Sequence, residues 1–116
     1  VEEGEEGTIE KLKNNKLNRL NILLLGIRGA RDPHGGLLTD TIMVVSIKPR
    51  TGEVALISIP RDLYVKMPNS DYRNKINETY ALGIKRKDWK KGLEYSKKTV
   101  SDVTGLDIHY AVSVDF

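Results

Sequence analysis

Two charged side chains, Asp40 and Arg61, stand beside apolar segments that could form neighbouring strands. Asp40 precedes the apolar segment 41–48, and Arg61 follows the apolar segment 53–59. If these segments pair as a hairpin, both side chains reach the sheet rim opposite the connecting turn. Phosphoryl transfer commonly uses a carboxylate that binds Mg²⁺ and a guanidinium that binds phosphate oxygens. Two plainer interpretations stay open: a loop-capping Asp40, and a surface ion pair of Arg61 with Asp40 or Asp62 that contributes little.

Lys75 and a glycine-rich loop give weaker signals for phosphate binding. Lys75 begins the segment 75–82, which has helical character, and a lysine near the positive end of a helix dipole favours an anionic partner. A solvated lysine explains the position equally well. The loop at 26–38 has neither the Gly-Lys-Ser/Thr of a Walker loop nor a Gly-x-Gly-x-x-Gly fingerprint. Glycines of this kind more often only form a turn.

The charge distribution favours anionic partners. The net charge is +3, although residues 1–10 alone hold five acidic side chains and no basic one, so the rest of the chain is more basic than the total. A dense basic group lies near the predicted second helix: Lys85, Arg86, Lys87, Lys90, Lys91, Lys97 and Lys98. This group could bind anionic lipid or glycan, but a solvated helix face is the better interpretation. No nucleic-acid motif accompanies it, so nucleic acid is not an expected partner.

Composition excludes several classes of function. The absence of cysteine excludes thiol catalysis, disulfides and cysteine-bound metal. No run of about 18 apolar residues is present, so no segment of this sequence is expected to span a membrane. No signal-peptide pattern opens the chain.

The elements that must position the charged residues follow from apolar periodicity and turn residues. Residues 1–20 are expected to be an acidic linker with a short helix at 8–20, and 21–116 to be the domain proper. The expected elements of the domain are strands at 21–26, 41–48, 53–59 and 108–116, and helices at 75–82 and 88–103.

This order predicts an α/β fold: a layered α-β-α domain with a central mixed β-sheet. Its last strand ends the sequence, so the domain is expected to be incomplete at its C-terminus. Two helices of this length can cover only one face of the sheet, although its strands are apolar on both faces. The exposed apolar face left over predicts either a homodimer or packing against a missing C-terminal half.

Taken together, these segments resemble the LytR-CpsA-Psr family over about residues 20–116. The stretches that carry the resemblance, in family order, are 21–26, 38–43, 45–54, 56–62, 75–77, 80–81 and 112–116. Each stretch alone is weak. The ordered set is specific, above all Ser-Ile-Pro-Arg-Asp at 58–62 followed by Lys-Ile-Asn at 75–77.

The resemblance implies a membrane-anchored enzyme on the extracytoplasmic face of the bacterial cell membrane. It would bind a polyprenyl-pyrophosphate-linked glycopolymer with Mg²⁺ and transfer the polymer to peptidoglycan. By the resemblance, Asp40 contacts the metal and pyrophosphate, and Arg61 and Lys75 bind the substrate. The family domain continues past the position of Phe116, so this chain would be its N-terminal portion, in which case the fragment alone could be inactive. The membrane would be reached through an N-terminal anchor that this sequence lacks.

Two positions depart from the family pattern. Many members carry aspartate two residues after the glycine that ends the first strand, where this chain has Arg28. Many also carry arginine two residues before the second aspartate, where this chain has Leu38. Asp32 could replace the missing carboxylate as a metal ligand, and Arg28 or Arg31 could replace the missing guanidinium in binding substrate.

Two other functions fit the same residues. A lipid pyrophosphatase would use the same site with water as the acceptor. A non-catalytic module would bind anionic glycan or lipid through the basic helix. Dependence on Mg²⁺ separates these classes, because a site built around Asp40 needs metal and a basic patch does not.

Overall fold

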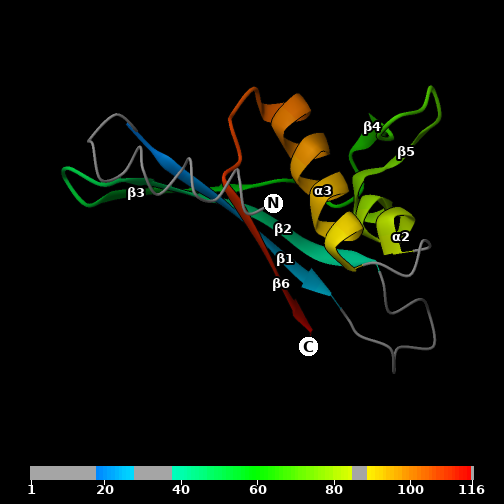
Figure 1. The fold of residues 1–116 in the computed structure, drawn as a ribbon, viewed down its shortest axis with the longest axis horizontal. Coiled ribbons are helices and arrows are strands. Elements are labelled where there is room, and N and C mark those ends of the chain that lie inside the picture. Colours follow the sequence, from blue (N-terminus) through cyan, green and yellow to red (C-terminus); the bar gives the residue numbers. More distant parts are fainter. Residues whose placement is uncertain (1–17, 28–37, 85–88, 116) are drawn as a thin grey trace.

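A computed structural model describes residues 18–27, 38–84 and 89–115 of the chain (Figure 1). The elements in order are β1 (Leu20–Ile27), β2 (Thr39–Lys48), β3 (Glu53–Ser58), β4 (Tyr64–Lys66), β5 (Arg73–Lys75), the 3₁₀ helix η1 (Ile76–Glu78), α2 (Thr79–Ile84), α3 (Trp89–Thr104) and β6 (Tyr110–Asp115). In these ranges no helix is long and apolar enough to cross a membrane.

Strands β2 and β3 form the predicted antiparallel hairpin. Their register runs from Lys48 opposite Glu53 to Met43 opposite Ser58. The turn closes because the N–H of Gly52 donates to the carbonyl of Lys48 at 2.8 Å while Gly52 takes φ +74°, a conformation that glycine adopts without steric cost. Asp40 and Arg61 therefore lie at the opposite end of the hairpin from this turn.

The main sheet has the order β3-β2-β1-β6. β1 is antiparallel to β2 and parallel to β6, so the sheet is mixed, and the predicted α/β class is confirmed. In Figure 1 the first and last described strands lie side by side. β4 and β5 form a separate two-stranded sheet.

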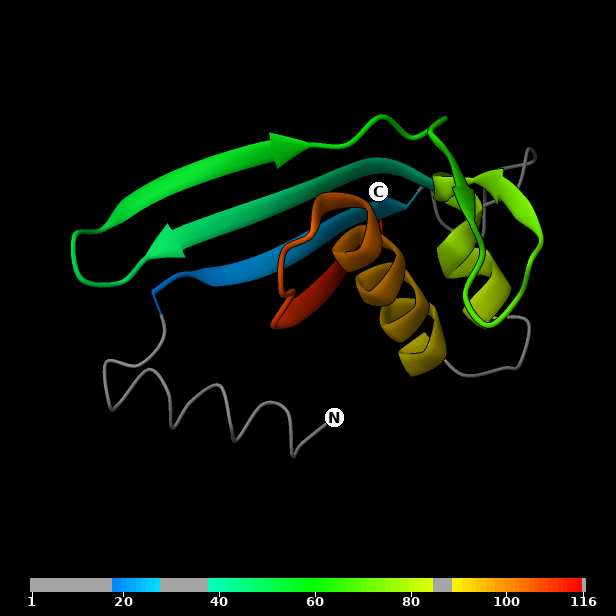
Figure 2. The same cartoon turned by 90° about the horizontal axis from the view of Figure 1, so that it is seen from above.

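One face of the main sheet is covered by α2 and α3. Leu23 and Val44 are fully buried on this face and belong to the same core cluster as Tyr80 of α2 and Val100 of α3. Figure 2 shows α3 crossing in front of β1 and β6. This layer is the hydrophobic core that fixes the rim at which Asp40 lies.

The opposite face of the sheet carries exposed apolar side chains. Alternation along the strands directs Val54 and Leu56 of β3, and Val112 and Val114 of β6, to this side. Their exposed fractions are between 46% and 64%. In the described part of the chain both α-helices lie on the other face, as the count of helices predicted.

The expected helix at 75–82 is wrong at its start. Lys75 ends β5, and a helix proper begins only at Thr79. The reason is long-range hydrogen bonding: the N–H of Ile76 donates to the carbonyl of Leu63 at 2.7 Å, and that of Asn77 donates to the carbonyl of Arg61 at 3.1 Å. The helix-dipole argument for Lys75 fails with it, because the 3₁₀ helix that follows has only three residues.

The second predicted helix is confirmed to within one residue at each end. α3 ends where Gly105 adopts φ +74° and donates its N–H to the carbonyl of Ser101 at 2.8 Å. The spacing of positions 89, 93, 96, 100 and 103 predicts one buried stripe along this helix. Ser96 and Val100 are buried as predicted, but Val103 is 43% exposed. The expected helix at 8–20 falls mostly outside the described residues, and Leu20 begins β1.

Candidate active site

Asp40 and Arg61 are brought together by continued pairing beyond the end of β3. The N–H of Ile59 donates to the carbonyl of Ile42 at 2.9 Å, which keeps the chain beside β2 until Pro60 ends the ladder. Thr39 anchors the start of β2, because its buried hydroxyl donates to the carbonyl of Asn77 at 3.3 Å. The start of β2, which carries Asp40, and the segment after β3, which carries Arg61, therefore lie side by side at the same edge of the sheet.

The side chains of Asp40 and Arg61 form an ion pair. Nη1 of Arg61 lies 2.9 Å from Oδ1 of Asp40, with side-chain exposures of 48% and 23%. The prediction that both lie on one rim is confirmed. A pair this exposed contributes about 0–1 kcal/mol to stability. Its chemical value lies elsewhere: the guanidinium has five N–H donors in a planar fork, and about half of the side chain faces solvent, where an anion could reach it.

Lys75 lies next to this rim. Its Nζ is 3.7 Å from Oδ1 of Asp62, and both side chains are more than half exposed. The backbone hydrogen bonds from Ile76 and Asn77 tie this segment to the turn that carries Arg61. Lys75 and Arg61 thus lie on two segments held together by backbone hydrogen bonds, although they are 14 positions apart in sequence.

Asn77 lies beside this rim, since its backbone N–H donates to the carbonyl of Arg61 at 3.1 Å, and the sequence pattern assigned no role to it. It is 8% exposed, and its Oδ1 has no hydrogen-bond partner within the described ranges. A buried amide oxygen without a donor is costly unless a ligand or water supplies one. Its only sequence signal was its place in the Lys-Ile-Asn stretch, beside Lys75.

The remaining predicted site residues, Arg28, Arg31 and Asp32, lie outside the described residues. Within the described ranges no group of three or more His, Asp or Glu side chains could hold a metal ion. Asp40 offers one carboxylate at the rim. Mg²⁺ is commonly bound by one or two carboxylates, while substrate phosphates and water fill its remaining coordination positions. Asp40 therefore fits a Mg²⁺ site in which the substrate supplies further ligands.

Comparison with known proteins decides the family. The sequence model described as LytR_cpsA_psr family matches residues 2–116. The chain belongs to the LytR-CpsA-Psr family. A relative from Oceanobacillus iheyensis, named polyisoprenyl-teichoic acid–peptidoglycan teichoic acid transferase TagU, is 40% identical over 96 residues. The match covers 83% of this chain and 28% of that protein.

Solved LytR-CpsA-Psr structures have the same fold. The crystal structure of B. subtilis TagU superposes with a TM-score of 0.65 at 26% identity, covering 85% of this chain and 36% of that one. TagT with bound octaprenyl pyrophosphate lipid gives a TM-score of 0.65 at 26% identity, covering 84% and 34%. The chain thus spans about a third of the length of the proteins that it matches.

Proposed function

We propose that this chain is the N-terminal portion of a phosphotransferase domain that moves a glycopolymer from polyprenyl pyrophosphate to peptidoglycan. The observation that carries the proposal is the Asp40–Arg61 pair at 2.9 Å on the sheet rim of a LytR-CpsA-Psr chain. The names of its relatives support it, since they are teichoic acid transferases and one TagT structure holds octaprenyl pyrophosphate. Both the lipid carrier and peptidoglycan are met at the extracytoplasmic face of the cell membrane, where we place the protein.

In the proposed reaction, a hydroxyl oxygen of a peptidoglycan sugar forms a bond to the phosphorus that carries the glycan. The bond from that phosphorus to the bridging oxygen breaks, polyprenyl phosphate leaves with the electron pair, and the hydroxyl proton is released. Arg61 would bind pyrophosphate oxygens through its fork, Asp40 would orient the guanidinium, and Lys75 would add a second positive charge. Mg²⁺, when bound at Asp40, would neutralise pyrophosphate charge.

The lipid pyrophosphatase alternative uses the same residues and differs only in taking water as the acceptor. The binding-module alternative differs in kind, because a basic surface attracts any anion and requires no metal. The metal requirement therefore tests the proposed site directly.

We expect the affinity of the chain for a short polyprenyl pyrophosphate to fall at least about tenfold, or ~1.4 kcal/mol, when Mg²⁺ is replaced by EDTA. Isothermal titration calorimetry would measure it. Asp40→Asn should abolish the metal dependence, because the neutral amide is a poor ligand for a hard cation. Asp62→Asn is the matched control and should leave the dependence intact. Equal affinity with and without Mg²⁺ in the unaltered chain would favour the basic surface.

For the 116-residue chain in isolation we expect self-association through the open face of the sheet. Burying one exposed large apolar side chain is worth about 1.5–3 kcal/mol. Leu56→Lys should therefore weaken association about tenfold, whereas Ser58→Lys, an exposed position on the same strand and face, should have a smaller effect. Light scattering over a concentration series measures the change. A stable monomer at high concentration with a cooperative melt above about 60 °C would contradict the expectation.

A further inference from the structure

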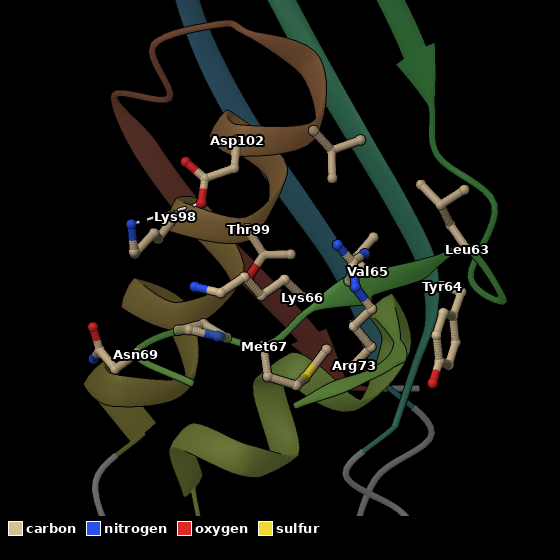
Figure 3. Close-up of a pocket in the computed structure, with 12 residues that line it drawn as sticks. Leu63, Tyr64, Val65, Lys66, Met67, Asn69, Arg73, Lys98, Thr99 and Asp102 are labelled. Carbon is tan, nitrogen blue, oxygen red and sulfur yellow. Dashed lines mark ion pairs between the residues drawn. The ribbon is translucent and has the colours of Figure 1, made fainter. Parts of the chain in front are cut away.

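A second concave site lies between the β4–β5 hairpin and the C-terminal half of α3. It encloses about 400 Å³ and takes Tyr64, Lys66 and Arg73 from the hairpin, and Thr99 and Asp102 from the helix (Figure 3). Neither Asp40 nor Arg61 lines it. The site is thus separate from the ion pair on the rim, although β4 follows the turn that carries Arg61.

The charge of this pocket is positive. Lys66 and Arg73 from the hairpin and Lys98 from α3 line it, and Asp102 is the acid among the lining residues. Lys98 lies 3.6 Å from Asp102 in an exposed helix pair. Lys66 and Arg73 have no ion pair with any residue that the structure describes. Two cationic side chains are therefore available to a ligand.

The placement of Lys66 and Arg73 is itself unfavourable without an anion. The two residues are directly opposite each other in the antiparallel β4–β5 register. Like charges at opposed positions of a strand pair repel and destabilise it. A bound anion would attract both Lys66 and Arg73 and so offset their mutual repulsion, whereas solvent only screens that repulsion.

Thr99 provides an independent sign of a ligand. It is 2% exposed and lines the pocket, yet its hydroxyl has no hydrogen-bond partner among the described residues. A helical threonine can donate its hydroxyl to the carbonyl four residues earlier, as Thr104 does to Val100 at 2.7 Å. Buried polar atoms in native proteins almost always have a hydrogen-bond partner. The Thr99 hydroxyl has none in the described residues, so a ligand bound in the pocket could supply it.

We propose that this pocket binds a phosphate group other than the one that reacts. A tetrahedral oxyanion accepts from the fork of Arg73, the ammonium of Lys66 and the hydroxyl of Thr99 at once. The proposal deepens the proposed transfer function and rests on it for the source of the phosphate: the polymer carried by the lipid, with phosphate groups spaced along it. A membrane lipid headgroup carries the same chemistry, and the test separates the two sources.

The geometry of the hairpin connects the pocket with the rim. Arg73 and Lys75 are two positions apart on β5, so both side chains point to the same face, about 7 Å apart along the strand. Lys75 pairs with Asp62, next to Arg61, while Arg73 lines the pocket. Cationic side chains thus lead from the rim to the pocket, as a chain with repeated phosphates would require.

The test is binding of a glycerol phosphate oligomer to the 116-residue chain, followed by calorimetry and by ³¹P NMR. Arg73→Gln should weaken binding about tenfold and Thr99→Val several-fold, since each removes donors to phosphate. Lys48→Gln removes the same charge at the far end of β2 and should have no effect. Thr99→Val should also leave the melting temperature unchanged or raise it, because it removes an unsatisfied buried hydroxyl.

The outcomes separate this proposal from the transfer function. Arg61→Ala should weaken oligomer binding much less than Arg73→Gln does, while it weakens binding of polyprenyl pyrophosphate the more strongly of the two, so each site can fail alone. Loss of binding to phosphatidylglycerol vesicles in Arg73→Gln, with unchanged oligomer binding, would overturn the polymer as source and assign the phosphate to lipid. Equal oligomer affinity in the unaltered chain, Arg73→Gln and Thr99→Val would overturn the pocket itself.

Discussion

Replacing Arg61 with alanine should weaken binding of a polyprenyl pyrophosphate about 10- to 100-fold. The expected loss follows from hydrogen bonds to charged groups, which are worth about 1.5–3 kcal/mol, at about 1.4 kcal/mol per tenfold in affinity. Arg61 lies at the rim with about half of its side chain exposed and is held at 2.9 Å from Asp40, so it can donate in a fixed direction. Calorimetric titration in Mg²⁺ would measure the loss.

Two control variants distinguish binding through the planar guanidinium donors of Arg61 from binding through positive charge alone. Arg61→Lys keeps the charge but loses the planar pair of donors, so it should recover only part of the affinity. Lys97→Ala removes a lysine of α3 whose Nζ donates to the carbonyl of His109 at 3.3 Å, and should cost much less. Losses of equal size for Arg61→Ala and Lys97→Ala would favour a general basic surface over a pyrophosphate site.

Unfolding should not account for the effect of Arg61→Ala. The ion pair that the change removes is exposed, and exposed pairs contribute about 0–1 kcal/mol to stability. The melting temperature of Arg61→Ala should therefore stay within a few degrees of the unaltered chain, about 4–8 °C per kcal/mol for a small domain. A large fall in melting temperature would mean that Arg61 has a structural role.

The strands of the main sheet could be predicted because local signals agree with the tertiary structure. The apolar segments 41–48 and 53–59, with a glycine-containing turn between them, specify a hairpin without knowledge of the rest of the chain. The same local reasoning placed Asp40 and Arg61 on one rim, since hairpin register alone brings them together. Roles for these residues in binding and catalysis stay predictions.

The segment around Lys75 could not be predicted because distant groups determine it. Whether residue 76 enters a helix or an extended pairing depends on the carbonyls of Leu63 and Arg61, and no local pattern reports their position. The orphan amide oxygen of Asn77 has the same origin, since satisfaction of a buried group is a property of its surroundings. Val103 was expected in the core and instead lines the pocket beside the hairpin, because β4 and β5 occupy that side of α3.

Gly83→Ala should reduce the stability of the chain by about 3 kcal/mol, the upper part of the range for overpacked positions. A Cβ on Gly83 of α2 would lie 2.4 Å from the backbone nitrogen of Gly92 in α3, and 2.5 Å from the carbonyl carbon of Lys91. Real Cβ contacts are essentially never shorter than 3.0 Å. The obstacle is backbone, which cannot turn aside as a side chain can, so the two helices must separate.

The sign of this change distinguishes packing from helix propensity. Alanine is the better helix former by about 1 kcal/mol, so propensity alone predicts that Gly83→Ala stabilises α2. Separation of α2 from α3 would instead open the core at Tyr80 and Val100, which are buried in the same cluster. A loss of about 3 kcal/mol is a large part of the roughly 5–15 kcal/mol by which such domains are stable, and at about 4–8 °C per kcal/mol it should lower the melting temperature by about 12–24 °C.

Gly92→Ala is the matched comparison for Gly83→Ala. A Cβ at Gly92 would meet the Cδ1 and Cε1 atoms of Tyr80 and its carbonyl oxygen, all at 3.0 Å. A ring can tilt by a few tenths of an ångström, so this variant should lose less stability than Gly83→Ala. Denaturant unfolding followed by circular dichroism gives both values. If Gly83→Ala were as stable as the unaltered chain, the close crossing of α2 and α3 would be wrong, and with it the placement of the helix layer that supports the rim.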